Sequence, residues 1–142
     1  MFKTEWTPIV PAVTELAGEA GTLAVWLIGS RANGTERKDS DWDLLVFCEQ
    51  EPVPAPQKRE FVDILRVGPS GRVLLEGKSE EHMLQLANFQ WKVIAKRHAS
   101  YVGTKFIESS CGVAVDYDSP RVLSSNLKAI LLWSIEDGLF ST

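Results

Sequence analysis

The stretch Trp26–Phe47, WLIGSRANGTERKDSDWDLLVF, decides the fold of this 142-residue chain. An apolar run ends at Gly29-Ser30, a polar segment follows, and a second apolar run begins with two aspartates, Asp41 and Asp43. Short apolar runs bounded by turn residues predict buried strands. We therefore expect two strands joined by a turn and a polar excursion, with the second strand returning beside the first.

Asp41 and Asp43 are predicted to project from the same face of the second strand, because strand residues two apart share a face. Two neighbouring carboxylates repel each other unless they share a cation, and oxygen ligands of this kind suit Mg²⁺ or Mn²⁺. Trp42, Leu44 and Val46 occupy the alternate positions and are expected in the core. The alternative is a polar strand entry in which one aspartate caps a turn.

The Gly29-Ser30 turn is the predicted phosphate-binding half of the site. Glycine at a strand end lets the chain turn sharply and lets a ligand approach closely. Ser30 and the amides after it are expected to open a short helix, whose free N–H groups attract phosphate. Arg31 and Lys38 are candidates for charge-assisted contacts with phosphate, and the alternative for both is a solvent-facing position. The turn and the acidic pair together predict a site for a metal-bridged polyphosphate.

The string GSRANG followed by SDWDLLV resembles the signature of the nucleotidyltransferase superfamily related to DNA polymerase beta. The continuation R-A-x-G is most similar to its minimal nucleotidyltransferase branch. The resemblance implies an α/β (α+β) fold, a small mixed β-sheet with helices packed against it. It also implies transfer of a nucleoside monophosphate, most simply AMP, from a nucleoside triphosphate to a hydroxyl acceptor, with release of pyrophosphate. Carried over by position, Gly29 and Ser30 hold the triphosphate, and Asp41 and Asp43 ligate metal.

Members of this superfamily usually carry a third carboxylate on a neighbouring strand. Asp63, in the apolar frame FVDIL, is the predicted third catalytic ligand, and Asp116, in GVAVDYD, is the alternative. In the implied mechanism one ion, held by Asp41 and Asp43, binds the triphosphate, and a second, shared with Asp63, lowers the pKa of the acceptor hydroxyl. If the third ligand is missing, the second hypothesis applies: a catalytically weak or inactive nucleotide-binding module, such as an antitoxin-type subunit.

The acceptor is not specified by the sequence. A protein or a small molecule fits, and the resemblance to minimal family members, which often occur beside a helical protein in toxin–antitoxin pairs, makes a helical protein partner an expectation. Modification of a small molecule such as an aminoglycoside is disfavoured, because the chain leaves little room for a separate acceptor-binding domain. The broad apolar face near the C-terminus indicates either deep burial or a homo-oligomer surface.

Composition limits the class of protein and its partners. The length predicts one domain over residues 1–142, and a net charge of −4 argues against broad binding of nucleic-acid backbone. No apolar run reaches membrane-spanning length and the N-terminus lacks a secretory signal, so we expect a cytoplasmic protein. Cys48 and Cys111 lack C-x-x-C spacing and are expected to be buried thiols.

Periodicity in the rest of the chain predicts a mixed α/β unit. The segment 83–95 fits either one helix or a short helix followed by a strand from Phe89. The other expected elements are a helix over 8–20, a hairpin over 60–76, a helix beginning near Ser79, and a helix over 125–137 with Gly138 as its cap.

Overall fold

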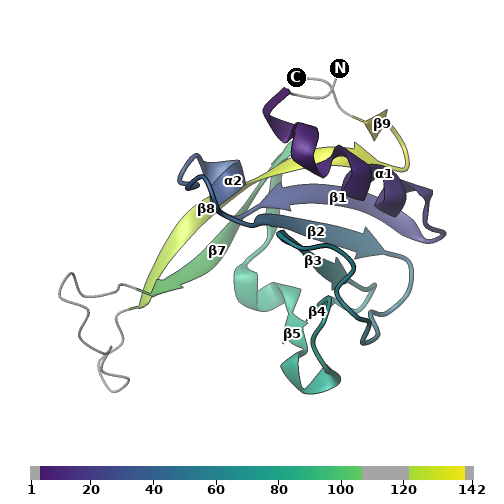
Figure 1. Ribbon diagram of the computed structural model, residues 1–142. Coiled ribbons are helices and arrows are strands. Elements are labelled where there is room, and N and C mark those ends of the chain that lie inside the picture. Colours follow the sequence, from purple (N-terminus) through teal and green to yellow (C-terminus); the bar gives the residue numbers. More distant parts are fainter. Residues whose placement is uncertain (1–3, 107–121, 140–142) are drawn as a thin grey trace.

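The computed structural model describes residues 4–106 and 122–139, which form one curled, mixed sheet of nine strands with few helices (Figure 1). The strand order is β5-β4-β3-β2-β1-β8-β7-β6, and β9 pairs with β8. Among the described pairs, β2 and β3 run parallel and the others antiparallel. The strands are β1 (Thr22–Ile28), β2 (Trp42–Cys48), β3 (Val62–Val67), β4 (Arg72–Leu75), β5 (Leu84–Gln85), β6 (Lys92–Ala95), β7 (His98–Phe106), β8 (Val122–Ser134) and β9 (Gly138–Leu139).

The helix expected over 8–20 is confirmed as α1 (Val10–Gly18), which continues from the 3-10 helix η1 (Thr4–Ile9). Proline at the start of α1 fits there because the first helical N–H groups have no partner within the helix. Val13 and Leu16 are buried, and they pack α1 onto one face of the sheet (Figure 1).

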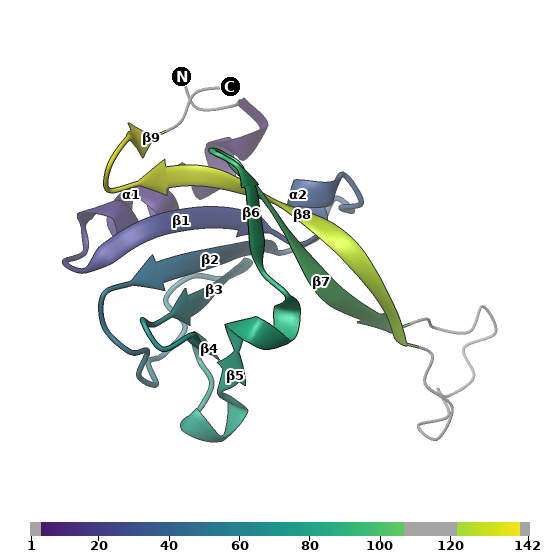
Figure 2. The same cartoon turned by 180° about the vertical axis from the view of Figure 1, so that it is seen from behind.

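The sheet buries apolar side chains on both faces. Trp42, Leu44 and Val46 of β2 belong to the cluster under α1, as their alternation predicts. Leu45 and Phe47 lie on the opposite face, in a second cluster with Trp26 and Trp91. The sheet curls so far that β6 crosses in front of β1 and β2 when the molecule is seen from behind (Figure 2). Asp43 shares the second face, because it is two residues before Leu45.

The helix expected over 125–137 is wrong: this segment is β8, which pairs with β1 and β7. Ala129 and Leu131 are buried on one face of the sheet and Leu132 on the other. A strand buried on both faces has apolar residues at consecutive positions, and such a run also matches helical spacing. Gly138 does not cap a helix; with φ +73° it begins β9 after a turn.

Helices are fewer than the sequence suggested, and the fold is mainly sheet. The helix expected at Ser79 is a single 3-10 turn, η2 (Glu80–His82), and the Ser79 side chain accepts no capping hydrogen bond from it. In 83–95 a short helix does precede a strand, as the second alternative has it, but η3 (Leu86–Phe89) includes Phe89 and β6 begins only at Lys92. The hairpin over 60–76 is confirmed as β3–β4. No helix in the described part of the chain has the length and apolar character needed to cross a membrane.

Candidate functional site

Asp43 and Asp63 lie directly opposite each other at the start of two neighbouring strands. The parallel pairing of β2 with β3 aligns Asp43 with Asp63, and two residues further on it aligns Leu45 with Leu65. Both carboxylates are partly buried, whereas Asp41 precedes β2 and is exposed. The sheet therefore brings the predicted third carboxylate, Asp63, against one member of the predicted pair.

The pKa of Asp43 is raised from 3.8 to about 7. Burial is the largest cause, followed by the negative charge of Asp63, a side-chain hydrogen bond with Asp63, and the charge of Asp41. A hydrogen bond between two carboxyl groups needs a proton on one of them, so the contact with Asp63 favours the protonated form of Asp43. A bound divalent cation relieves the same repulsion, because it supplies the positive charge that the shared proton otherwise provides.

The Asp43–Asp63 pair has the donor chemistry that Mg²⁺ or Mn²⁺ requires, and it fits such an ion. Across residues 4–106 and 122–139, however, no three His, Cys, Asp or Glu side chains gather as a set that could hold a metal. The charge of Asp41 contributes to the raised pKa of Asp43. Asp116, the alternative third carboxylate, and Cys111 lie outside the described residues, while Cys48 is a free, partly buried thiol.

Gly29 ends β1 beside Asp43, with which Ile28 is paired across the sheet. Its backbone has φ +75° and ψ −160°, a region that side chains other than hydrogen rarely allow. A Cβ atom at this position would lie 2.3 Å from Asp43 Oδ2, so only glycine lets the carboxylate approach the turn this closely. Ser30 then opens α2 (Ser30–Asn33), a single helical turn. The predicted turn and the acidic side chain are thus in direct contact.

Tyr101, from β7, is a residue of this site that the sequence did not reveal. The Gly29 N–H donates a hydrogen bond of 2.8 Å to the Tyr101 hydroxyl. Burial raises the pKa of Tyr101, the hydrogen bond from Gly29 lowers it, the charge of Asp43 raises it, and a hydrogen bond with Asn33 lowers it. No local motif marks Tyr101, because it reaches the turn only through the pairing of β7 with β8 and of β8 with β1.

Asn33 ties the same turn to β8. Its Nδ2 donates to the carbonyl oxygens of Gly29 (2.8 Å) and Lys128 (3.1 Å), and its Oδ1 accepts from the Lys128 N–H (2.8 Å). An asparagine side chain carries the same donor and acceptor as a peptide group, so Asn33 pairs with β8 as a strand residue would. The hairpin β7–β8 therefore holds both ends of α2.

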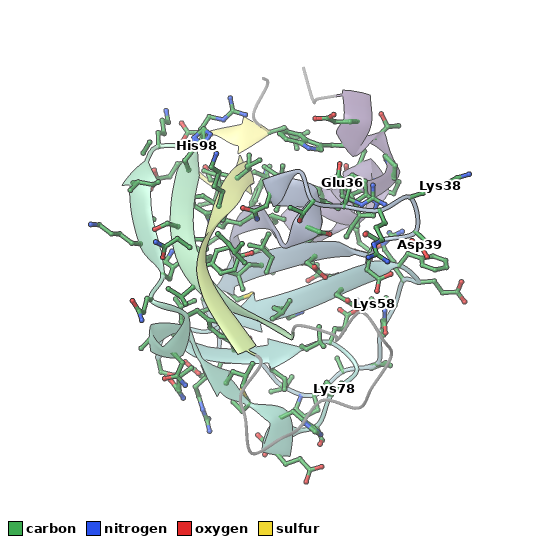
Figure 3. All side chains as sticks on the ribbon, turned by 90° about the vertical axis from the view of Figure 1, so that its left-hand side faces the viewer. Glu36, Lys38, Asp39, Lys58, Lys78 and His98 are labelled. Atoms are coloured by element: carbon green, nitrogen blue, oxygen red, sulfur yellow. The ribbon has the colours of Figure 1, made fainter. Side chains whose placement is uncertain are left out.

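Arg31 and Lys38, the predicted phosphate-contacting cations, point elsewhere. Arg31 donates to the carbonyl oxygen of Ser40, at 2.8 Å from Nη2, and its guanidinium lies 4.5 Å from the centre of the Trp42 ring. It therefore fastens the 31–41 segment to the sheet. Lys38 is exposed and extends away from the body of the molecule, as does neighbouring Asp39 (Figure 3). In this structure neither cation faces the Asp43–Asp63 pair.

An apolar cavity of about 60 Å³ lies next to the acidic pair, one step further along the strands. Leu45 and Leu65 follow Asp43 and Asp63 by two residues on the same sheet face, and Ile28 pairs with Asp43 across β1 and β2. Its lining consists of Ile28, Leu45, Leu65, Val73, Leu86, Phe89, Trp91 and Tyr101.

In comparison with known proteins, one segment of the chain matches a family model. Residues 14–69 match the family model for polymerase beta, nucleotidyltransferase. The matched segment runs from α1 through β3 and contains Gly29, Asp41, Asp43 and Asp63, but not β7 or β8. No curated protein and no solved structure matches the chain.

Proposed function

We propose that this chain transfers a nucleoside monophosphate, most simply AMP, from a nucleoside triphosphate to a hydroxyl acceptor; the match of residues 14–69 to the polymerase beta nucleotidyltransferase family model supports this proposal. One observation carries the proposal: Asp43 and Asp63 meet across β2 and β3, and Asp43 also contacts the Gly29 turn. A carboxylate pair beside a turn that lets the backbone approach a ligand suits the transfer of a metal-bound phosphoryl group.

The reaction forms one bond and breaks one. The acceptor oxygen bonds to the α-phosphorus, the bond from that phosphorus to the bridging oxygen breaks, and pyrophosphate leaves with the electron pair. Asp63, on the outer strand of the pair, is the group we assign to receive the acceptor's proton. Asp43 and Asp63, with Asp41 nearby, would hold Mg²⁺ or Mn²⁺, which when bound would supply charge stabilisation for the phosphoryl group. Gly29 and Ser30 position the triphosphate.

The test is incubation of the purified protein with α-labelled nucleoside triphosphates and Mg²⁺ or Mn²⁺. We expect release of pyrophosphate or transfer of label, and loss of most of it in Asp41→Asn and Asp43→Asn. Asp39→Asn is the matched control, because Asp39 is an exposed aspartate two residues before Asp41 on the same loop. Transfer that survives substitution of both Asp41 and Asp43 contradicts the proposal.

A second candidate function is a nucleotide-binding partner module without turnover. The observation that favours it is the lack, within the described residues, of a three-ligand metal cluster. The resemblance implies three carboxylates in the enzymes of this superfamily, whereas here Asp41 is exposed and does not join Asp43 and Asp63 in such a set. Thermal stabilisation by ATP and Mn²⁺ without release of pyrophosphate supports this second function; turnover that depends on Asp43 excludes it.

A further inference from the structure

The Gly29 turn is held from a part of the chain far away in sequence. Tyr101 is 72 residues from Gly29 and lies outside the segment that matches the family model, yet its hydroxyl accepts the Gly29 N–H at 2.8 Å. The backbone of Gly29 adopts a conformation that costs free energy unless the surroundings hold it in place. This hydrogen bond is therefore one of the contacts that fix the turn.

Packing fixes the position of the Tyr101 hydroxyl itself. The side chain is largely buried, and its ring stacks with Trp91 at 6.4 Å between ring centres. Trp91 in turn packs edge-on against Trp26 at 5.0 Å and against Phe47 at 5.5 Å. A ring held in such a cluster has little rotameric freedom, so its hydroxyl is a rigid acceptor and not a mobile one.

The turn and the acidic pair respond to each other because they are in contact. Asp43 Oδ2 occupies the space next to the Gly29 Cα, where a Cβ would approach it to 2.3 Å. A shift of the turn therefore displaces the Asp43 carboxylate or opens a gap beside it. Groups behind the residues that bind metal or substrate commonly change affinity or rate when they are removed.

We propose that Tyr101 is a positioning residue of the nucleotide site, whose hydroxyl fixes the Gly29 turn against Asp43. The inference rests on the proposed function, since it assigns a role within that site. It makes the β7–β8 hairpin part of the site. Asn33, which connects the turn to Lys128 of β8, fixes the same turn from its other end.

The test uses Tyr101→Phe, which keeps the ring in the aromatic cluster and removes only the hydroxyl. We expect three changes: faster hydrogen exchange of the Gly29 amide in metal-free protein, a Kd for Mn²⁺ raised about tenfold, and a lower kcat with ATP. Loss of folded protein would lower the number of binding sites but not change the Kd, so the Kd separates positioning from a merely structural role. Phe89→Leu is the matched control, because Phe89 lines the same apolar cavity and carries no hydroxyl.

The outcomes separate this inference from the proposed function. If the wild-type protein turns over ATP and Tyr101→Phe has the same Mn²⁺ affinity and kcat, the inference is overturned and the function stands. Faster exchange at Gly29 with unchanged affinity also overturns it, since the hydroxyl is then only structural. Tighter nucleotide binding by Tyr101→Phe overturns it too, because the hydroxyl would then compete with phosphate for the Gly29 amide. A wild-type protein that binds neither Mn²⁺ nor nucleotide refutes the proposed function and this inference together.

Discussion

Replacing Asp43 by asparagine is expected to stabilise the metal-free protein at alkaline pH while it removes the proposed activity. Asp43 faces Asp63 across the parallel pair and lies beside the exposed Asp41. The charges of Asp63 and Asp41 both disfavour ionisation of Asp43 when no cation is present. Asparagine is uncharged at every pH, and its amide can donate a hydrogen bond to Asp63 as a protonated aspartate would. The substitution therefore removes the repulsion and keeps the contact.

The size and sign of the effect follow from the pKa. The folded protein raises the pKa of Asp43 from 3.8 to about 7, so the folded state binds this proton more tightly than the unfolded state. The stabilising contribution is fully present below about pH 4 and is lost as pH rises through about 7. A pKa shift of about three units changes the free energy of unfolding by about 4 kcal/mol for a fully buried group. Asp43 is only partly buried, so solvent screening reduces this contribution to about 2 kcal/mol.

The assay is urea denaturation of wild type and Asp43→Asn at pH 5 and pH 8, with EDTA present. Between these two pH values, the stability of the variant relative to wild type should increase by about 1 kcal/mol, since part of the effect already occurs below pH 5. Asp39→Asn should show no such change, because Asp39 is exposed on the neighbouring loop. A stability difference between Asp43→Asn and wild type that is equal at both pH values refutes the reasoning.

Three other substitutions and one ligand test address the same site. Gly29→Ala should lower the free energy of unfolding by about 3 kcal/mol in urea denaturation, because φ is +75° and the new Cβ meets Asp43; a loss below about 1 kcal/mol would mean that the turn relaxes freely. Arg31→Ala should lower the free energy of unfolding by about 1–2 kcal/mol, because Arg31 loses its contacts with Ser40 and the Trp42 ring. Lys38→Ala should leave the free energy of unfolding unchanged. Equal effects of the two substitutions would contradict the inference that only Arg31 fastens the loop. Mn²⁺ at pH 8 should raise the melting temperature of wild type but not of Asp43→Asn, and equal shifts would place the ion elsewhere.

The strand–turn–strand unit could be predicted because its signals are local. The apolar runs, the glycine and the alternation around Asp43 each constrain only a few neighbouring residues, and together they fix which face carries the carboxylates. The helix prediction for 125–137 was wrong for the opposite reason. Whether a run of apolar residues forms a helix or a strand buried on both faces depends on partners elsewhere in the chain, here β1 and β7. Tyr101 was missed on the same ground, since its contact with Gly29 exists only once those strands are paired.

The meeting of Asp43 and Asp63 depends on an unusual connection between two parallel strands. Parallel neighbours are generally joined by a helix, but the segment 49–61 is proline-rich and holds none. Side-chain hydrogen bonds fasten it instead: the buried Glu76 accepts the Lys58 N–H through Oε1 (2.9 Å), and Glu51, within the segment, accepts the Ser70 N–H (2.8 Å).

These two carboxylates tie the connection to the β3–β4 hairpin, and Arg66 of β3, 3.6 Å from Glu76 Oε2, adds an opposite charge to the buried group. The parallel register that aligns the acidic pair is thereby held from the far side of β3. A helix in this place would have packed through its own apolar stripe, which a sequence can reveal. A loop held by scattered polar contacts leaves no such pattern. The residues that set the geometry of this site therefore extend beyond its motif, to Glu76 on one side and to Tyr101 on the other.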